Sequence, residues 1–143
     1  STGTVICTGG EYDGKIGVTL LNSDGTPGDQ HYANLADDLP SSWTWTDERK
    51  GIEPEEMTVV EKDDKIFVLT TLQDPSSVVV YNITDPANPV YDSGAITELN
   101  DYTLEENGES EGEAEGLHYR NGFVLVANTK DPSVTLLKAS WVD

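Results

Sequence analysis

The sequence contains little positive charge. Its 143 residues include 8 Lys and Arg against 27 Asp and Glu, which gives a formal net charge of −19. A surface of this kind repels the phosphates of nucleic acids and the headgroups of anionic lipids, so we expect it to bind neither. The acidic excess fits simple solubility, or attraction of hard cations or basic partners. Adaptation to brine fits less well, because Lys, with its long apolar stem, supplies most of the cations.

The sequence also lacks a long apolar run. It has no stretch of about 18 consecutive apolar residues, so membrane insertion is not expected. The chain opens at Ser1-Thr2-Gly3, without an initiator Met or a signal-peptide pattern. These features favour a processed product of a longer protein.

Cysteine and histidine are scarce. The single cysteine, Cys7, cannot form a disulfide within the chain, and it follows the apolar residues Val5 and Ile6. It is either a buried, inert thiol or one half of an interchain disulfide. The two histidines, His31 and His118, have no spacing that joins them to Cys7 as a ligand set, so we do not expect a transition-metal site.

Helix signals are scarce too, and strand signals take their place. The apolar stretches are short, rich in β-branched residues and bounded by Gly, Pro, Asn and Asp, which is typical of strands. Pairs such as Asp63-Asp64, Asp74-Pro75 and Asn121-Gly122 indicate tight turns between them. We read Thr8-Gly9-Gly10 and Asp24–Gly28 as turns as well. Strands are predicted at residues 4–8, 15–21, 56–61, 65–71, 77–83, 90–96, 122–128 and 133–139.

The most informative feature is an internal repeat. The segment Phe67–Tyr81 returns as Val124–Leu137 when Asp74-Pro75 is aligned with Asp131-Pro132. A weaker third copy runs through residues 5–20, with Asp13 aligned to Asp74. Four short strands per period of about 60 residues are typical of a β-propeller blade with one long loop.

We therefore predict an all-β chain with two clear propeller blades and a partial third. Propellers close with about four to eight blades, so this chain would form an incomplete propeller that other chains complete. The expected division is a partial blade and loop at 1–46, a blade at 47–97, an acidic loop at 98–112 and a last blade at 113–143. The segment 98–115 carries eight carboxylates and no Lys or Arg, as expected of a solvated connection.

The second copy resembles a known family. Residues 47–55 (DERKGIEPE), the strand Ile66–Thr71 and the segment Val79–Pro89 (VVYNITDPANP) resemble the secreted propeller proteins called the choice-of-anchor I family. Its members are often described as alkaline-phosphatase-like, and the animal mesenchyme-specific cell-surface glycoproteins are similar to them. The later motifs at residues 115–117, 125–128 and 133–136 resemble the final blade of that family. The resemblance implies a longer protein whose other blades lie N-terminal to this segment.

The chain departs from the family pattern in two places. The family usually continues Glu-Pro-Glu-Gly, whereas here Glu56 stands in place of the glycine, and in the second copy Ala114 replaces the proline while Gly116 is kept. Glycine permits positive φ and close approach of the backbone to a ligand. The loss of this glycine puts the role of the first copy in doubt.

Four glutamates are candidate metal ligands. Glu53, Glu55, Glu113 and Glu115 begin the strands that we place innermost in two blades. Carboxylates that converge there would suit Ca²⁺, which takes six to eight oxygen ligands. The alternative is that they are ordinary acidic loop residues, and no EF-hand loop supports the metal.

Three further residues are candidates for other roles. Asn82-Ile83-Thr84 is a glycosylation sequon, which is compatible with a secreted or cell-surface protein. Trp43 and Trp45 alternate around Thr44, so both indoles would share one face of an extended segment. They would pack between blades or contact a partner or an apolar ligand.

The function predicted from the sequence is a non-catalytic, extracellular β-propeller chain that assembles with companion chains and holds Ca²⁺. One alternative is a subunit of a Ca²⁺-dependent phosphatase or phosphodiesterase, although only Arg49 and Arg120 could act as a guanidinium clamp on a phosphate. The other alternative is a carrier of a small pigment or lipid held between subunits.

Overall fold

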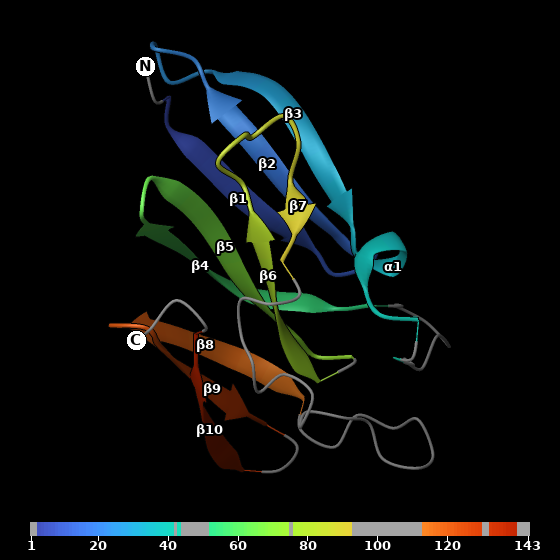
Figure 1. Ribbon diagram of the computed structural model, residues 1–143. Coiled ribbons are helices and arrows are strands. Elements are labelled where there is room, and N and C mark those ends of the chain that lie inside the picture. Colours follow the sequence, from blue (N-terminus) through green and yellow to red (C-terminus); the bar gives the residue numbers. More distant parts are fainter. Residues whose placement is uncertain are drawn as a thin grey trace.

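The described part of the chain forms three antiparallel β-sheets stacked in chain order. A computed structural model describes residues 3–41, 43, 52–74, 76–92, 113–129 and 132–139. Figure 1 shows the sheets as successive layers, with the second sheet between the first and the third. Each sheet is a meander of strands that follow one another along the chain. The all-β prediction is therefore confirmed.

The first sheet contains β1 (Val5–Gly10), β2 (Lys15–Leu21) and β3 (Pro27–Asn34), in that order. The β2–β3 turn depends on Gly25, which has a φ of +82°. The carboxylate of Asp24 accepts hydrogen bonds from the hydroxyl (2.7 Å) and the backbone N–H (3.0 Å) of Thr26. These two bonds lower the pKa of Asp24 from its ordinary value, and the bond from the hydroxyl has the larger effect.

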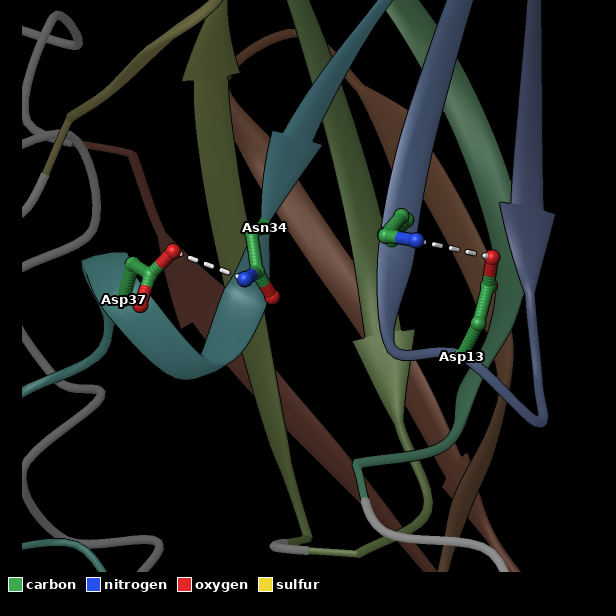
Figure 2. A network of polar contacts seen from close by, with 4 residues as sticks. Asp13, Asn34 and Asp37 are labelled. Carbon is green, nitrogen blue, oxygen red and sulfur yellow. Dashed lines mark hydrogen bonds and ion pairs between the residues drawn. The ribbon is translucent and has the colours of Figure 1, made fainter.

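A short helix, α1 (Leu35–Asp38), follows β3 directly. Asn34 precedes it, and its side-chain amide donates to the Asp37 carboxylate at 2.7 Å. On the neighbouring β1–β2 turn, the Lys15 ammonium lies 3.4 Å from the Asp13 carboxylate (Figure 2). Both contacts are exposed, so they fix local geometry and contribute little to stability.

The second sheet has the order β4 (Pro54–Lys62), β5 (Lys65–Leu72), β6 (Ser77–Asn82) and β7 (Val90–Tyr91). The third has the order β8 (Ala114–Arg120), β9 (Phe123–Asn128) and β10 (Ser133–Lys138). Their first hairpins turn through Asp63-Asp64 and Asn121-Gly122, all four residues with positive φ. Positive φ at both central positions is what a tight β-hairpin with right-handed strand twist requires.

Two hydrophobic clusters hold the sheets together. The strands β5 and β6 are buried on both faces, and their alternate side chains point to opposite neighbours. The cluster between the first and second sheets contains Ile16, Val18, Ala33, Leu35, Leu39, Ile52, Val68, Leu72, Val79, Tyr81 and Ile83. The cluster between the second and third sheets contains Val60, Phe67, Leu69, Val78, Val80, Ala114, Leu117, Val124, Val126 and Leu137.

Tyr81 is the largest fully buried side chain. Its hydroxyl donates to the Asp38 carboxylate at 3.1 Å, and its ring centroid lies 5.6 Å from that of Tyr91. Burial, together with the negative charge of Asp38, raises the pKa of Tyr81 far above its ordinary value. Burial also raises the pKa of Tyr91. The helix α1 is thereby joined to the second sheet through one polar contact.

Most predicted strands are present within a few residues of their predicted ends. β3 and α1 were not predicted. β8 was expected only as the innermost strand that Glu113 and Glu115 begin, without predicted bounds, and the last predicted residues of β7, from 93 to 96, lie outside the described ones. The turn predicted at Thr8-Gly9-Gly10 is wrong, because Gly9 and Gly10 end β1. Gly9 serves packing there: a Cβ at this position would lie 2.7 Å from the Met57 methyl group.

Candidate functional site

The second and third sheets meet along a seam of hydrogen bonds at the beginnings of β4 and β8. Each strand has an irregularity at the same place, after Pro54 in β4 and after Ala114 in β8, where one extra residue interrupts the pairing. The Thr71 hydroxyl accepts from the Glu56 N–H (3.1 Å) and donates to the Glu115 carbonyl oxygen (3.0 Å). One hydroxyl therefore bridges the two irregular strands.

Two further bonds complete this seam. The Glu56 carboxylate crosses to the third sheet and accepts from the Leu117 N–H at 2.8 Å. On the other side, the Ser76 hydroxyl accepts from the Ala114 N–H at 3.1 Å. Glu56 thus satisfies the Leu117 N–H, which the alternation of the antiparallel β8–β9 pairing points away from β9.

The pairing of strands gives the structural register of the repeat. Pro54 pairs with Leu72 and Ala114 pairs with Asn128, so Pro54 corresponds to Ala114 and Leu72 to Asn128. Ser77 and Ser133, the partners of Leu72 and Asn128 on the other side, begin the third strands. The alignment on Asp-Pro pairs is therefore wrong by one residue within the strands. A slip of one residue exchanges the two faces of a strand.

In the structural register, an apolar face of the third sheet corresponds to a buried face of the second. Phe67, Leu69, Val78 and Val80 are at most 5% exposed, because the third sheet covers them. Their counterparts are Phe123 and Leu125, each 43% exposed, Val134, 64% exposed, and Leu136, 59% exposed. We call these four residues the open face. No described residue covers them as the third sheet covers the second.

The border of the open face carries two basic side chains. In β8, Leu117 and Tyr119 pack toward the second sheet, so His118 and Arg120 lie on the same side as the open face. Both are exposed. The counterpart of Arg120 in β4 is Val60, which is buried. In a chain of net charge −19, this places local positive charge beside apolar surface.

The four candidate metal ligands are at the beginnings of β4 and β8, as predicted. Glu53 and Glu113 lie just before the strands, and their carbonyl oxygens accept from the Gln73 N–H (2.8 Å) and the Thr129 N–H (3.1 Å). The Glu115 carboxylate accepts from the Gln73 amide at 3.3 Å. Glu55 is exposed in β4.

The structure does not gather these glutamates into a ligand set. Among the described residues, no group of three or more His, Cys, Asp or Glu side chains is placed to hold a metal ion. Ca²⁺ binding by Glu53, Glu55, Glu113 and Glu115 stays a prediction.

The remaining candidates lie at the edges of the core. Cys7 is a half-buried free thiol that packs against the cluster between the first and second sheets, and burial raises its pKa. Trp43 packs against the same cluster. The side-chain amide oxygen (Oδ1) of Asn82 accepts from the Thr84 N–H at 3.0 Å, which closes a turn at the end of β6. Interchain disulfide formation, glycosylation and partner contact stay predictions.

Several sequence features lie outside the described residues, among them Trp45, Arg49 and the acidic segment 98–112. Among the described residues, no helix is long and apolar enough to cross a membrane. Comparison of the chain with protein-family models, with curated proteins and with solved structures found no match.

Sequence reasoning missed the open face, which is the feature that the structure brings out most clearly. The signal was present, because Phe67-Val68-Leu69 recurs unchanged as Phe123-Val124-Leu125. Aligning the two Asp-Pro pairs shifted the strands by one residue, so that Phe67 was matched to Val124 and not to Phe123.

Proposed function

We propose that this chain is a non-catalytic assembly subunit whose three sheets are successive blades of an extracellular β-propeller completed by companion chains. The observation that carries the proposal is the open face, which repeats the apolar pattern of a face that is covered within the chain. A sheet with two apolar faces is stable when another element covers each face, because apolar surface is then removed from water. The companion would cover Phe123, Leu125, Val134 and Leu136 with another apolar sheet.

The open face can supply part of the free energy of assembly. Full burial of a large apolar side chain is worth about 1.5–3 kcal/mol. About half of each open-face side chain remains to be covered, so each would contribute roughly 1 kcal/mol. Arg120 and His118 at the border would favour a companion that presents carboxylates there. An extracellular location agrees with the sequon at Asn82.

A tandem chain tests whether the open face accepts a sheet. A second copy of residues 93–143 is added after Asp143, which supplies a connection and another third sheet. That sheet presents Leu117, Val124, Val126 and Leu137, the side chains that cover the second sheet in this chain. The added sheet should dock, raise the unfolding free energy by about 4 kcal/mol, and slow amide exchange in β9 and β10 of the first copy.

The same substitution in two places provides the control. Leu136→Asp in the first copy would put a charge into the new interface and remove the gain in unfolding free energy. Leu136→Asp in the added copy would lie on the terminal, exposed face and leave the gain intact. An added sheet that neither stabilises the chain nor protects β9 and β10 contradicts the proposal. The natural assembly should also have a native mass greater than the 15.5 kDa of one chain.

A further inference from the structure

The first strand of the first sheet does not correspond to the first strands of the other two. The beginnings of β4 and β8 meet, because the Glu56 carboxylate binds the Leu117 N–H. The end of β1, in contrast, meets the beginning of β4: a Cβ on Gly9 would lie within 3.4 Å of both Met57 and Pro54. β1 is therefore antiparallel to β4 and is not its counterpart.

The counterpart of β1 is β5. The β1–β2 turn joins Gly10 to its partner Lys15, and the β5–β6 turn joins Leu72 to its partner Ser77, so these two pairs correspond. In this register, side chains that face the next sheet in the first sheet correspond to side chains that face the next sheet in the second. Val5, Cys7, Ile16 and Val18 pack toward the second sheet, and their counterparts Phe67, Leu69, Val78 and Val80 pack toward the third.

The first sheet therefore lacks a counterpart of β4. In the second sheet, β4 pairs with β5 on the side away from β6. In the first sheet, no described strand pairs with β1 on the side away from β2. The Leu21 N–H donates to the Thr4 carbonyl oxygen, so antiparallel alternation points the N–H and C=O groups of Val5, Cys7 and Gly9 toward this open edge.

A groove lies where the end of the missing strand would be. It has a volume of about 890 Å³ and is lined by Val5 of β1, by Val59 of β4 and by the β4–β5 hairpin. Val59 is 52% exposed, although its counterpart Tyr119 packs against the cluster that contains Val60. A residue equivalent to Val60, on a strand added to β1, would cover Val59 in the same way.

We propose that the open edge of β1 binds an extended segment of a companion chain, which adds to the first sheet as an antiparallel strand. Its chemistry follows from β4, the strand that occupies this position in the second sheet. It places an apolar side chain opposite Val5 and against Val59, and its backbone bonds to Val5 and Cys7. Strand addition of this kind takes affinity from the backbone and specificity from alternate side chains.

The inference extends the proposed function to a second surface, at the other end of the stack from the open face. A companion that contributes both a sheet and a strand would contact the chain at two places. The two surfaces can be tested separately, so failure at the β1 edge leaves the result of the tandem chain unaffected.

The test adds a peptide to the full chain. The peptide carries the sequence of residues 53–62 (EPEEMTVVEK), because β4 is the strand that fills this position in the second sheet. Binding is followed by fluorescence anisotropy of a labelled peptide and by amide exchange. The expected result is saturable binding, with amide exchange at Val5 and Cys7 slowed at least tenfold at saturation.

Two N-methylated peptides decide whether the contact is a backbone pairing. In β4, the N–H of Thr58 faces β5, whereas the N–H of Val59 faces away. N-methylation at the position of Thr58 should weaken binding at least tenfold, and N-methylation at that of Val59 should have little effect. Equal binding of the two methylated peptides, or unchanged exchange at Val5 and Cys7, would overturn the inference.

A variant of the chain gives the reciprocal control. Cys7→Pro removes the N–H that faces the open edge and breaks no bond to β2, and proline is tolerated in edge strands. The Cys7→Ala variant loses the thiol and keeps this N–H. Peptide binding should be lost in Cys7→Pro and retained in Cys7→Ala. Binding that survives in Cys7→Pro would place the peptide elsewhere and contradict the inference.

Discussion

At the scale of single residues, the surroundings and not the residue type set the role of a side chain. Phe67 and Phe123 occupy the same place in successive sheets, yet they are 5% and 43% exposed. Glu56 and Gly116 also correspond, and only Glu56 reaches a backbone donor in the next sheet. The Gly116 position has little space, since a Cβ there would lie 3.0 Å from that of Ala127.

Tyr81 should make stability fall at high pH. Its pKa in the folded chain is raised, first by burial and then by Asp38. Above about pH 10 the unfolded chain loses this proton while the folded chain keeps it, so the unfolding free energy falls by up to about 1.4 kcal/mol per pH unit. Tyr81→Phe should cost about 1 kcal/mol at pH 7 and lessen the decline above pH 10, as measured by urea denaturation.

Tyr12→Phe is the matched control for this measurement. Tyr12 is 74% exposed, so Tyr12→Phe removes a tyrosine hydroxyl that lies outside the buried core. Tyr91, whose pKa is also raised by burial, should account for part of the decline that remains in Tyr81→Phe. Parallel pH profiles for wild type and Tyr81→Phe would show that Tyr81 does not carry the effect.

At the scale of elements, strands were predictable and their pairing register was not. β-branched and aromatic runs bounded by turn residues located most of the strands. β8 was expected to begin near Glu113, but its bounds were not predicted. Glu115, Gly116 and His118 interrupt its apolar pattern, and a strand that begins with an irregularity does not show a period of two. The repeat was recognised, but only the observed pairs showed which residues of the two copies correspond.

The seam between the second and third sheets should depend on the Glu56 carboxylate. Glu56→Ala leaves the partly buried Leu117 N–H without its acceptor, and the unfolding free energy should fall by about 1–3 kcal/mol. Glu56→Gln keeps an acceptor oxygen and should lose less than half as much. Urea denaturation measures both, with Glu61→Ala, an exposed glutamate of the same strand, expected within about 0.5 kcal/mol of wild type.

Equal losses for Glu56→Gln and Glu56→Ala would mean that a neutral acceptor oxygen does not replace the carboxylate in the hydrogen bond from Leu117, which would contradict this prediction. A loss in Glu61→Ala as large as that in Glu56→Ala would instead point to a general effect of charge on β4.

At the scale of the whole molecule, two features oppose each other. The stacked sheets leave an apolar face and an open strand edge, which favour association. The net charge of −19 opposes close approach of copies of this chain to one another. Basic groups beside the open face reduce that repulsion locally, which supports our proposal of a companion of different sequence.

Salt should stabilise the isolated chain. The Debye length falls from about 30 Å at 10 mM to about 8 Å at 150 mM ionic strength, which screens repulsion among the carboxylates. The unfolding free energy from urea denaturation should therefore rise between these NaCl concentrations. A variant with Asp24→Asn and Glu61→Gln, both at exposed positions, should respond less. A flat or falling salt dependence would show that charge repulsion does not limit stability.

The sequence by itself determined the composition-level properties and the element types: an acidic all-β chain, its turns, most of its strands and the presence of a repeat. These follow from local steric preferences and from periods that a strand displays along the chain. Only the tertiary structure decided which faces are covered, that β1 corresponds to β5, and that Glu56 reaches the next sheet. Those properties depend on contacts between residues far apart in the sequence, such as Glu56 with Leu117 and Thr71 with Glu115, which a local pattern does not contain.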